Sequence, residues 1–307
     1  MDIFLEKSIK PMLIKDMVKP FNNPDWLYEL KLDGIRCLAY LDDNSTDLRN
    51  KRNMLLLPKF PELKDIHMQV KGKCILDGEL IILKNGAPEF FELQRRTLLM
   101  DPFKIQLSYM KYPASYVAYD ILYLNSSELV DLPLIARKRI LNEIVDENAC
   151  ISVSRYVEEK GTELYSLADK QELEGVVAKK KDSKYVYDKR TKDWVKFKRM
   201  ADEDFVICGF IKQESHSTTI ILGKYKNGIL IYKGNVSLGV RSKPYNWTIR
   251  SSSPFYLNPL TYRDNITWVE PNLVCVVEYM PNSKNTLRQP VFKGVRDDVL
   301  PKDVVEF

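Results

Sequence analysis

Three charged side chains alternate with apolar ones in residues 26–34, which read Trp-Leu-Tyr-Glu-Leu-Lys-Leu-Asp-Gly. Alternate residues of a β-strand point to opposite faces, so Glu29, Lys31 and Asp33 share one face while apolar residues anchor the other. A lysine held in this way can attack phosphorus once its pKa falls from about 10.4, because the protonated amine is not nucleophilic. A half-buried strand with a solvated charged side is the commoner outcome for such a segment, so both interpretations stay open.

Acidic and aromatic side chains interrupt apolar runs farther along the chain. Asp77 and Glu79 share one face of an expected strand, and Glu174 begins another. A buried carboxylate is unfavourable unless a metal ion or a basic group offsets its lost hydration, so we expect such a cation beside these acids. Within the apolar run 116–123, Tyr119 is either a core residue, the commoner fate, or a platform for a stacked ring.

Basic and aromatic residues are concentrated in residues 179–199. Within this stretch Val195 and Phe197 are expected to point inward, whereas Lys196 and Lys198 share the opposite face of a strand. Such a combination suits a phosphate-rich partner. A solvated surface is the equally simple alternative.

The elements that must position these residues mix strands and helices over roughly the first 200 residues. One helix is expected to begin at Pro133. Its apolar stripe consists of Leu134, Ile140, Leu141, Ile144 and Val145. After about Met200 the pattern changes to strands and turns, so we expect two domains, at residues 1–200 and 201–307.

The second expected domain is rich in β-structure. Strands are predicted at residues 205–210 and 274–279, and a hairpin joins Thr219–Tyr225 to Ile229–Lys233 through Lys226-Asn227-Gly228. A module of about 100 residues with this pattern is typical of a small barrel.

Composition excludes several classes of protein. The chain has 307 residues, 45% of them hydrophobic and 29% charged, with a net charge of +5. It shows neither a membrane-spanning run nor a signal peptide, so we expect a cytoplasmic enzyme that does not contact membranes. Its five cysteines are odd in number and contain no Cys-x-x-Cys pair, which argues against a disulfide framework and a zinc site.

The order of the charged motifs is more informative than any single motif. They are Lys-x-Asp-Gly-x-Arg at 31–36, Asp-Gly-Glu at 77–79, Tyr-Asp at 119–120, Glu-Gly-Val-Val at 174–177 and Lys-x-Lys at 196–198. This order resembles the covalent nucleotidyltransferase superfamily of DNA ligases, RNA ligases and mRNA capping enzymes. Residues 203–210, 268–274 and 287–298 look like the OB domain of bacterial ATP-dependent DNA ligases, and the end-joining ligases are the closest likeness.

The resemblance implies a role for each matching residue. Lys31 would accept AMP, Glu29 would read the adenine, and Tyr119 would stack on it. Arg36 and Arg49 would contact the ribose, Arg36 also the nick phosphate, and Glu79 and Glu174 would lie beside the ribose and the metal ion. The bases expected to contact phosphate are Arg190, Lys196 and Lys198, and Arg296 would orient the leaving pyrophosphate. Lys179 is included in the nucleotide-binding set, although its odd spacing from Glu174 places the two on opposite faces of a regular strand.

This sequence departs from the family pattern in three places. Lys51 and Asp188 stand where the family usually has glycine. The last motif, Arg296-Asp297-Asp298, is followed by Val299 instead of lysine, and Lys302 is a candidate substitute.

The resemblance implies an α+β protein with a nucleotidyltransferase (adenylation) domain followed by a β-barrel OB domain, which closes over ATP and then clamps DNA. The implied activity is ATP-dependent sealing of nicked duplex DNA with magnesium or manganese, in repair, recombination or end joining. We expect a monomer that works with separate Ku-like and polymerase proteins. An RNA ligase or capping guanylyltransferase, and a non-catalytic OB-type nucleic-acid binder, are the alternatives.

Overall fold

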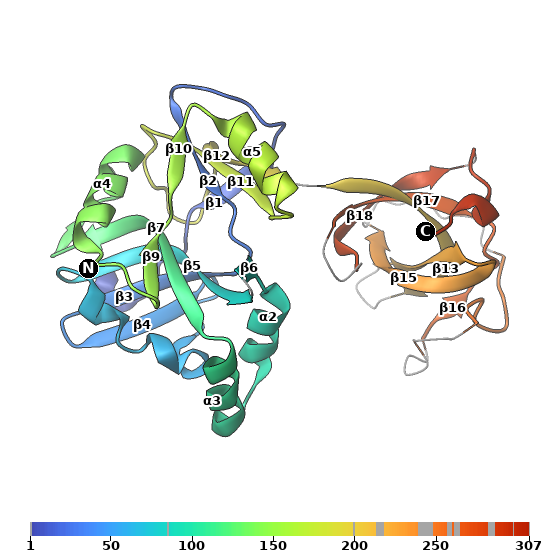
Figure 1. Ribbon diagram of the computed structural model, residues 1–307, viewed down its shortest axis with the longest axis horizontal. Coiled ribbons are helices and arrows are strands. Elements are labelled where there is room, and N and C mark those ends of the chain that lie inside the picture. Colours follow the sequence, from blue (N-terminus) through green and yellow to red (C-terminus); the bar gives the residue numbers. More distant parts are fainter. Residues whose placement is uncertain are drawn as a thin grey trace. The chain divides into compact units, whose positions relative to one another are not determined.

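Figure 1 shows a computed structural model of the chain, which describes residues 2–84, 86–198, 200–212, 218–238, 248–256, 260, 265–281, 286–296 and 298–306. Asp297 of the last motif lies outside the described residues. The chain forms two compact units, Met1–Lys198 and Arg199–Phe307. Every helix that the structure describes is too short or too polar to cross a bilayer.

The larger sheet of the first unit contains seven strands in the order β4-β3-β5-β7-β8, with β6 paired to β5 and β9 to β7. Its strands are β3 (Ile35–Asp42), β4 (Ser45–Asn50), β5 (Cys74–Lys84), β6 (Ala87–Pro88), β7 (Ala114–Leu124), β8 (Ser127–Glu128) and β9 (Ile151–Val153). In β3, Cys37 and Ala39 join one core cluster while Leu38 and Tyr40 join another. Because both faces of this sheet are covered, its central strands are apolar on both sides.

The smaller sheet has the strand order β1-β12-β11-β2-β10. Its strands are β1 (Leu13–Met17), β2 (Trp26–Leu30), β10 (Tyr156–Glu158), β11 (Gly175–Lys180) and β12 (Arg190–Lys198). One face is apolar and packs with α5, as Tyr28, Val195 and Phe197 share a buried cluster. The opposite face therefore carries the charged residues of the same strands.

Short helices connect and cover the two sheets of the first unit (Figure 1). They are α1 (Ile3–Glu6), α2 (Phe90–Leu98), α3 (Pro102–Lys111), α4 (Leu134–Ile144) and α5 (Gly161–Lys170), with 3₁₀ turns at Leu57–Lys59, Pro61–Leu63 and Ile66–Gln69. The predicted helix after Pro133 is confirmed as α4. Its buried residues are Arg137 and Lys138 together with Leu134, Leu141 and Ile144 of the expected stripe, whereas Ile140 is half-buried and Val145 follows the end of the helix.

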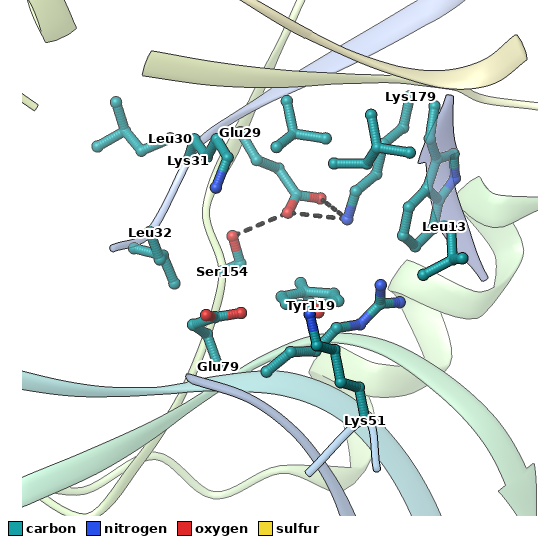
Figure 2. A pocket seen from close by; sticks show the side chains of 14 residues that line it. Leu13, Glu29, Leu30, Lys31, Leu32, Lys51, Glu79, Tyr119, Ser154 and Lys179 are labelled. Carbon is teal, nitrogen blue, oxygen red and sulfur yellow. Dashed lines mark hydrogen bonds and ion pairs between the residues drawn. The ribbon is translucent and has the colours of Figure 1, made fainter. Parts of the chain in front are cut away.

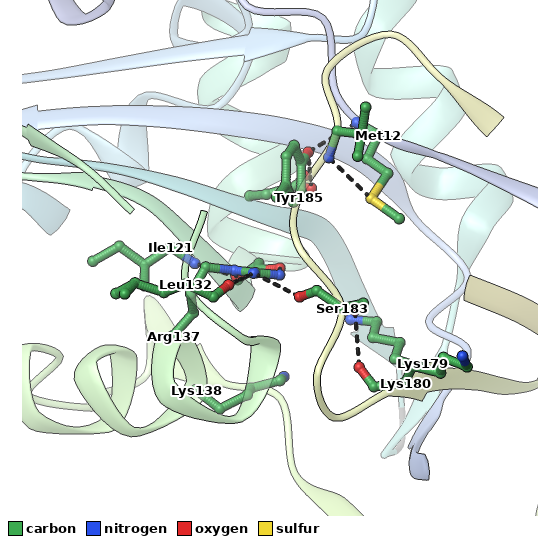
Figure 3. A network of polar contacts seen from close by, with 12 residues as sticks. Met12, Ile121, Leu132, Arg137, Lys138, Lys179, Lys180, Ser183 and Tyr185 are labelled. Carbon is green, nitrogen blue, oxygen red and sulfur yellow. Dashed lines mark hydrogen bonds and ion pairs between the residues drawn. The ribbon is translucent and has the colours of Figure 1, made fainter. Parts of the chain in front are cut away.

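Arg137 fixes α4 to the larger sheet, as Figure 3 shows. Its guanidinium binds both carboxylate oxygens of Asp120 in β7 at 2.8 and 2.9 Å. It also donates to the carbonyl oxygens of Leu132 at 2.5 Å and Ser183 at 3.0 Å. One buried side chain thus connects a strand, a helix and the loop that follows β11.

The second unit is a six-stranded antiparallel sheet in the order β15-β14-β13-β17-β18, with β16 paired to β13. Its elements are β13 (Ala201–Lys212), β14 (Thr218–Lys226), β15 (Ile229–Leu238), β16 (Thr267–Trp268), β17 (Val274–Met280), β18 (Arg288–Arg296) and the 3₁₀ helix Pro301–Asp303. The end strands β15 and β18 also approach each other, so the sheet curls toward a barrel. The predicted hairpin is present, and Asn227 and Gly228 both have positive φ, as its tight turn requires.

Candidate active site

A cavity of about 250 Å³ opens in the first unit between the charged face of the smaller sheet and the central strands β3, β5 and β7 of the larger one. Figure 2 shows Glu29, Lys31 and Lys179 on one side of it and Glu79 and Tyr119 on the other. Arg36 also lines it. The structure thus brings together six residues that the sequence singled out from segments far apart in the chain.

Strand register explains how the smaller sheet arranges its charges. Glu29 in β2, Val177 in β11 and Lys196 in β12 lie side by side across the strands. The next row of residues on this face lies two positions along each strand and contains Lys31, Gly175 and Lys198. The Lys31 backbone amide donates to the Gly175 carbonyl at 2.9 Å, and Gly175 is paired with Lys198. Each row places its side chains on the same face of the sheet.

The amine of Lys31 contacts a carboxylate at the start of β11. Its Nζ lies 2.8 Å from Glu174 Oε2, and the other oxygen of Glu174 is 3.1 Å from Lys198 Nζ. Burial opposes ionisation of Glu174, but the two ammonium groups outweigh it and hold the pKa of this carboxyl below its usual range. Lys196 has a lowered pKa, because burial and the positive charges of Lys198 and Lys31 all disfavour its charged form.

Glu29 is buried and has more partners than the sequence indicated. Its carboxylate lies 2.5 Å from Lys138 Nζ and 3.1 Å from Lys179 Nζ, and accepts a hydrogen bond from Ser154 Oγ at 3.0 Å. Burial lowers the pKa of Lys179 to about 8, despite the attraction of Glu29. A solvated charged face is therefore the wrong description of Glu29, which is only 3% exposed.

Lys179 also connects Glu29 to the aromatic part of the pocket. Its ammonium lies 4.5 Å from the centre of the Tyr119 ring and 4.3 Å from that of Trp194. Contacts of this kind between a cation and a ring face are attractive. The ring of Tyr119 is thus held at the pocket wall by packing and by charge, and its partial burial leaves one side facing the cavity.

Arg36 and Glu79 differ in how their charges are balanced. Arg36 makes two hydrogen bonds to Asp77, at 3.0 and 2.6 Å, and Tyr185 Oη donates to the same carboxylate at 2.7 Å. Among the described residues, no hydrogen bond or ion pair reaches the Glu79 carboxylate. Burial raises the pKa of Glu79 to about 8, although Lys31 and Arg36 act in the opposite direction.

Six of the predicted residues do not line the cavity, namely Glu174, Lys196, Lys198, Arg49, Arg190 and Arg296. Glu174 and Lys198 are nevertheless connected to it, because Glu174 binds both Lys31 and Lys198. Arg49 is bound to Asp47 through hydrogen bonds of 3.0 and 3.1 Å. Arg190 is exposed and donates to the Ile14 carbonyl at 2.7 Å, although it lies near enough to Lys196 to affect its pKa. Arg296 belongs to the second unit, where it binds Asp204 at 3.0 Å.

The odd spacing between Glu174 and Lys179 does not separate them as a regular strand would. β11 begins at Gly175, so Glu174 lies outside the strand, and Gly175 has φ of +141°. Glu174 therefore reaches Lys31 while Lys179 reaches Glu29, on the same side of the sheet. The expectation of opposite faces is wrong because strand alternation does not extend through this glycine.

Sequence reasoning missed several residues of the site, of which Lys138 is the most informative. It is fully buried on α4 and contacts Glu29. The helical spacing from Leu134 to Lys138 to Leu141 places this lysine on the buried side, so the signal was present. Ser154 and Tyr185 carried no comparable signal, because each lies outside a regular helix or strand.

The departures from the family pattern have different local explanations. Asp188 has φ of 53°, in the left-handed region that glycine favours and aspartate tolerates. Lys51 has no positive φ, so its backbone does not require glycine. Val299 packs against a buried cluster of the second unit, and Lys302 is exposed on the last 3₁₀ helix.

Comparison with known families matches both units. The family described as "ATP dependent DNA ligase domain" matches residues 4–198, and "ATP dependent DNA ligase C terminal region" matches residues 213–299. The ligase domain of LigD from M. tuberculosis, as a solved structure, has a TM-score of 0.57 and 25% identity, and covers 98% of this chain and 99% of that one.

Two relatives from Bacillus subtilis differ in how much of their length this chain covers. The SPbeta prophage-derived DNA ligase-like protein LigB is 30% identical over 67% of this chain and 73% of its own length. The bifunctional non-homologous end joining protein LigD is also 30% identical, over 88% of this chain, but the chain spans only 46% of that protein.

Proposed function

We propose that this chain, which belongs to the ATP-dependent DNA ligase family, seals nicks in duplex DNA with Lys31 as the residue that accepts AMP. The observation that supports this role most directly is the position of the Lys31 amine in the pocket, beside the carboxylate that also binds Lys198. The family matches favour this function over an RNA ligase, a capping enzyme or a non-catalytic OB-type binder.

Three displacements at phosphorus account for the reaction. The unprotonated Lys31 amine attacks the α-phosphorus of ATP, a phosphorus–nitrogen bond forms, pyrophosphate leaves and the amine proton passes to solvent. AMP is next transferred to the 5′-phosphate of the nick, which frees Lys31. The 3′-hydroxyl then attacks that phosphorus, closes the strand and releases AMP. One set of cations can stabilise all three transition states.

The proposed nucleotide site uses both sides of the cavity. Tyr119 would stack on adenine, and Glu29 and Lys179 would contact its edge. Arg36 would contact the ribose, and Lys196 and Lys198 the phosphates, with Arg190 and Arg49 farther out. Glu174 would release Lys31 when the anionic triphosphate enters, because both lysines then have phosphate oxygens to contact.

Glu79 and Glu174 are the residues that would hold a divalent metal ion. Glu79 is a carboxylate whose pKa burial raises to about 8, so a cation beside it would offset its desolvation. In the part of the chain that the structure describes, no cluster of three acidic, histidine or cysteine ligands occurs. Magnesium typically uses one or two carboxylates together with substrate phosphates, so these two acids are sufficient. Magnesium or manganese bound there would stabilise charge on the phosphoryl group being transferred.

We place the activity in DNA repair, and in end joining in particular, because the matched LigD relatives carry that function in their names. The chain spans less than half the length of those two relatives. For an end-joining role we propose Ku-like and polymerase proteins as its partners. A role in phage replication is the second candidate, since the LigB relative is prophage-derived. We expect the protein to act as a monomer.

Incubation with α-labelled ATP and magnesium tests the proposal. The label should become covalently attached to the protein, move to the 5′-phosphate when nicked DNA is added, and leave as AMP when the strand is sealed. Parallel reactions with GTP and with nicked RNA separate the alternative transferases. A protein that remains unlabelled by ATP under all metal conditions would not be a ligase of this kind.

A further inference from the structure

Lys51 differs from the other cations of the pocket in the partners available to it. Lys31 binds Glu174, Arg36 binds Asp77 and Lys179 binds Glu29. These three cations already face carboxylates within the unit. Lys51 also lines the cavity, yet it has no hydrogen bond or ion pair to any residue that the structure describes.

The turn that carries Lys51 is held by a network around Asn50. The Asn50 side chain accepts from the amides of Arg52 and Met54 at 2.9 and 3.0 Å, and its backbone amide donates to the Met54 carbonyl at 3.0 Å. The left-handed residue of this turn is Asn53, with φ of 62°. Lys51 therefore takes the place of the usual glycine without backbone strain, and its Cα is fixed at the cavity rim.

Figure 2 shows the direction of the Lys51 side chain. It rises from the side of the cavity that carries Glu79 and Tyr119, across from Lys31 and Glu29. An ammonium there adds an uncompensated positive charge to a pocket whose other cations are paired. The anionic groups that reach a ligase pocket are phosphates, of the nucleotide or of the nicked strand, and a lysine binds them as a point charge.

We propose that Lys51 is an additional phosphate-binding residue of this site. Its ammonium contacts a phosphate oxygen either of the ATP triphosphate or of the DNA strand at the nick. The inference rests on the proposed ligase function and deepens it. It assigns to this chain a contact that a glycine could not make, since glycine has no side chain.

Lys51→Gln tests the proposal, because it removes the charge and keeps most of the side chain. Arg52→Gln is the matched control, since Arg52 is exposed in the same turn, carries the same charge and does not line the cavity. Lys51→Arg keeps the charge. One arm measures the KM for ATP in self-adenylation without DNA, and the other measures the KM for a pre-adenylated nick in the absence of ATP.

We expect Lys51→Gln to raise one of these KM values about three- to tenfold, as befits a partly solvated charge contact. Lys51→Arg should restore it, Arg52→Gln should change it less than twofold, and added salt should shrink the difference. A rise in the first arm assigns the contact to the triphosphate, and a rise in the second assigns it to DNA. The inference is overturned if neither value changes, or if Arg52→Gln has an equal effect. Failure of the unmodified protein to become labelled would instead refute the proposed function.

Discussion

Lys31 is the residue on which the proposed chemistry depends. Its amine lies 2.8 Å from Glu174 and faces the cavity. Lys31→Ala removes the nucleophile of the first step and with it the lysyl-AMP that the second step consumes, whereas the third step starts from a nick that already carries AMP. We expect the variant to take up no label from ATP and to retain part of the sealing rate on a nick that carries AMP beforehand.

Both activities are best measured on the same preparation, with a thermal melt as the check on folding. Full ATP-dependent ligation by Lys31→Ala would show that another residue carries AMP. Loss of both activities with an unchanged melting temperature would give Lys31 a role in the last step as well.

We expect nucleotide choice to depend on the carboxylate of Glu29. A carboxylate offers only hydrogen-bond acceptors, so Glu29 suits the amino group of adenine and would leave the carbonyl oxygen of guanine unpaired and repelled. An unsatisfied buried contact costs about 1–3 kcal/mol. We therefore expect ATP to label the protein at least about tenfold more efficiently than GTP, measured as the ratio of kcat/KM values. Equal labelling by both nucleotides would contradict the role of Glu29.

The alternation of residues 26–34 correctly predicted that Tyr28 packs in a core while Glu29 lies on the opposite face. It could not predict that Glu29 is buried, because the side chains that cover it come from α4 and β11. Lys138 was missed for a related reason. Apolar periodicity ignores charged residues, even when they occupy the buried side of a helix.

Gly175 determines where β11 begins and where Glu174 points. With φ of +141° and an added Cβ only 2.0 Å from the Phe197 carbonyl oxygen, this position accepts only glycine. We expect Gly175→Ala to lower the free energy of unfolding by about 2–4 kcal/mol and to reduce label transfer strongly. Gly228→Ala is the control, since φ is +75° there but nothing lies within 4 Å, so its cost should be about 1 kcal/mol. Equal melting temperatures for the two variants would contradict this account.

The attachment of α4 to β7 depends on a buried pair. Arg137 and Asp120 are both fully buried and share two hydrogen bonds. Arg137→Met leaves the Asp120 charge without its partner, so we expect a loss of about 3–5 kcal/mol in unfolding free energy. The double variant Arg137→Met/Asp120→Asn should recover part of it, because no unpaired charge remains. Urea denaturation gives both values, and a double variant less stable than the single one would show that other contacts dominate.

Elements with a strong local pattern were predictable, and those set by tertiary contacts were not. The hairpin at Asn227-Gly228 and the helix after Pro133 follow from turn chemistry and spacing. The expectation that Glu174 and Lys179 lie on opposite faces assumes the alternation of a regular strand, and this alternation fails at Gly175. Ser154 and Tyr185 reach the site from loops, where no period specifies the direction of a side chain.

At the level of the whole chain, the comparisons confirm the expected fold class, a nucleotidyltransferase domain followed by an OB domain. The order of the motifs along the chain made this fold class predictable. The sequence did not explain why valine replaces the last lysine. In the structure Val299 packs against the cluster that contains Val206 and Cys208, so this position serves the core of the second unit.

Arg296 is the residue through which the second unit is expected to act on the nucleotide. Its guanidinium is bound to Asp204 at 3.0 Å and to Asp298 at 2.5 Å within that unit. Asp204 is partly exposed and Asp298 is exposed, so these ion pairs contribute little to the stability of the unit. With Val299 in place of the usual lysine, Arg296 would carry more of the charge-assisted contact to the leaving pyrophosphate.

We therefore expect Arg296→Ala to slow self-adenylation at least about tenfold, equivalent to roughly 1.4 kcal/mol of transition-state stabilisation. Sealing of a pre-adenylated nick should fall much less, because pyrophosphate takes no part in that step. Arg296→Lys keeps a charge but loses the planar fork, so its rate should lie between the two. Both steps are measured on one preparation, with the melting temperature as a check on the second unit. If sealing falls as far as adenylation, Arg296 serves the fold or the grip on DNA, and its proposed role toward pyrophosphate is wrong.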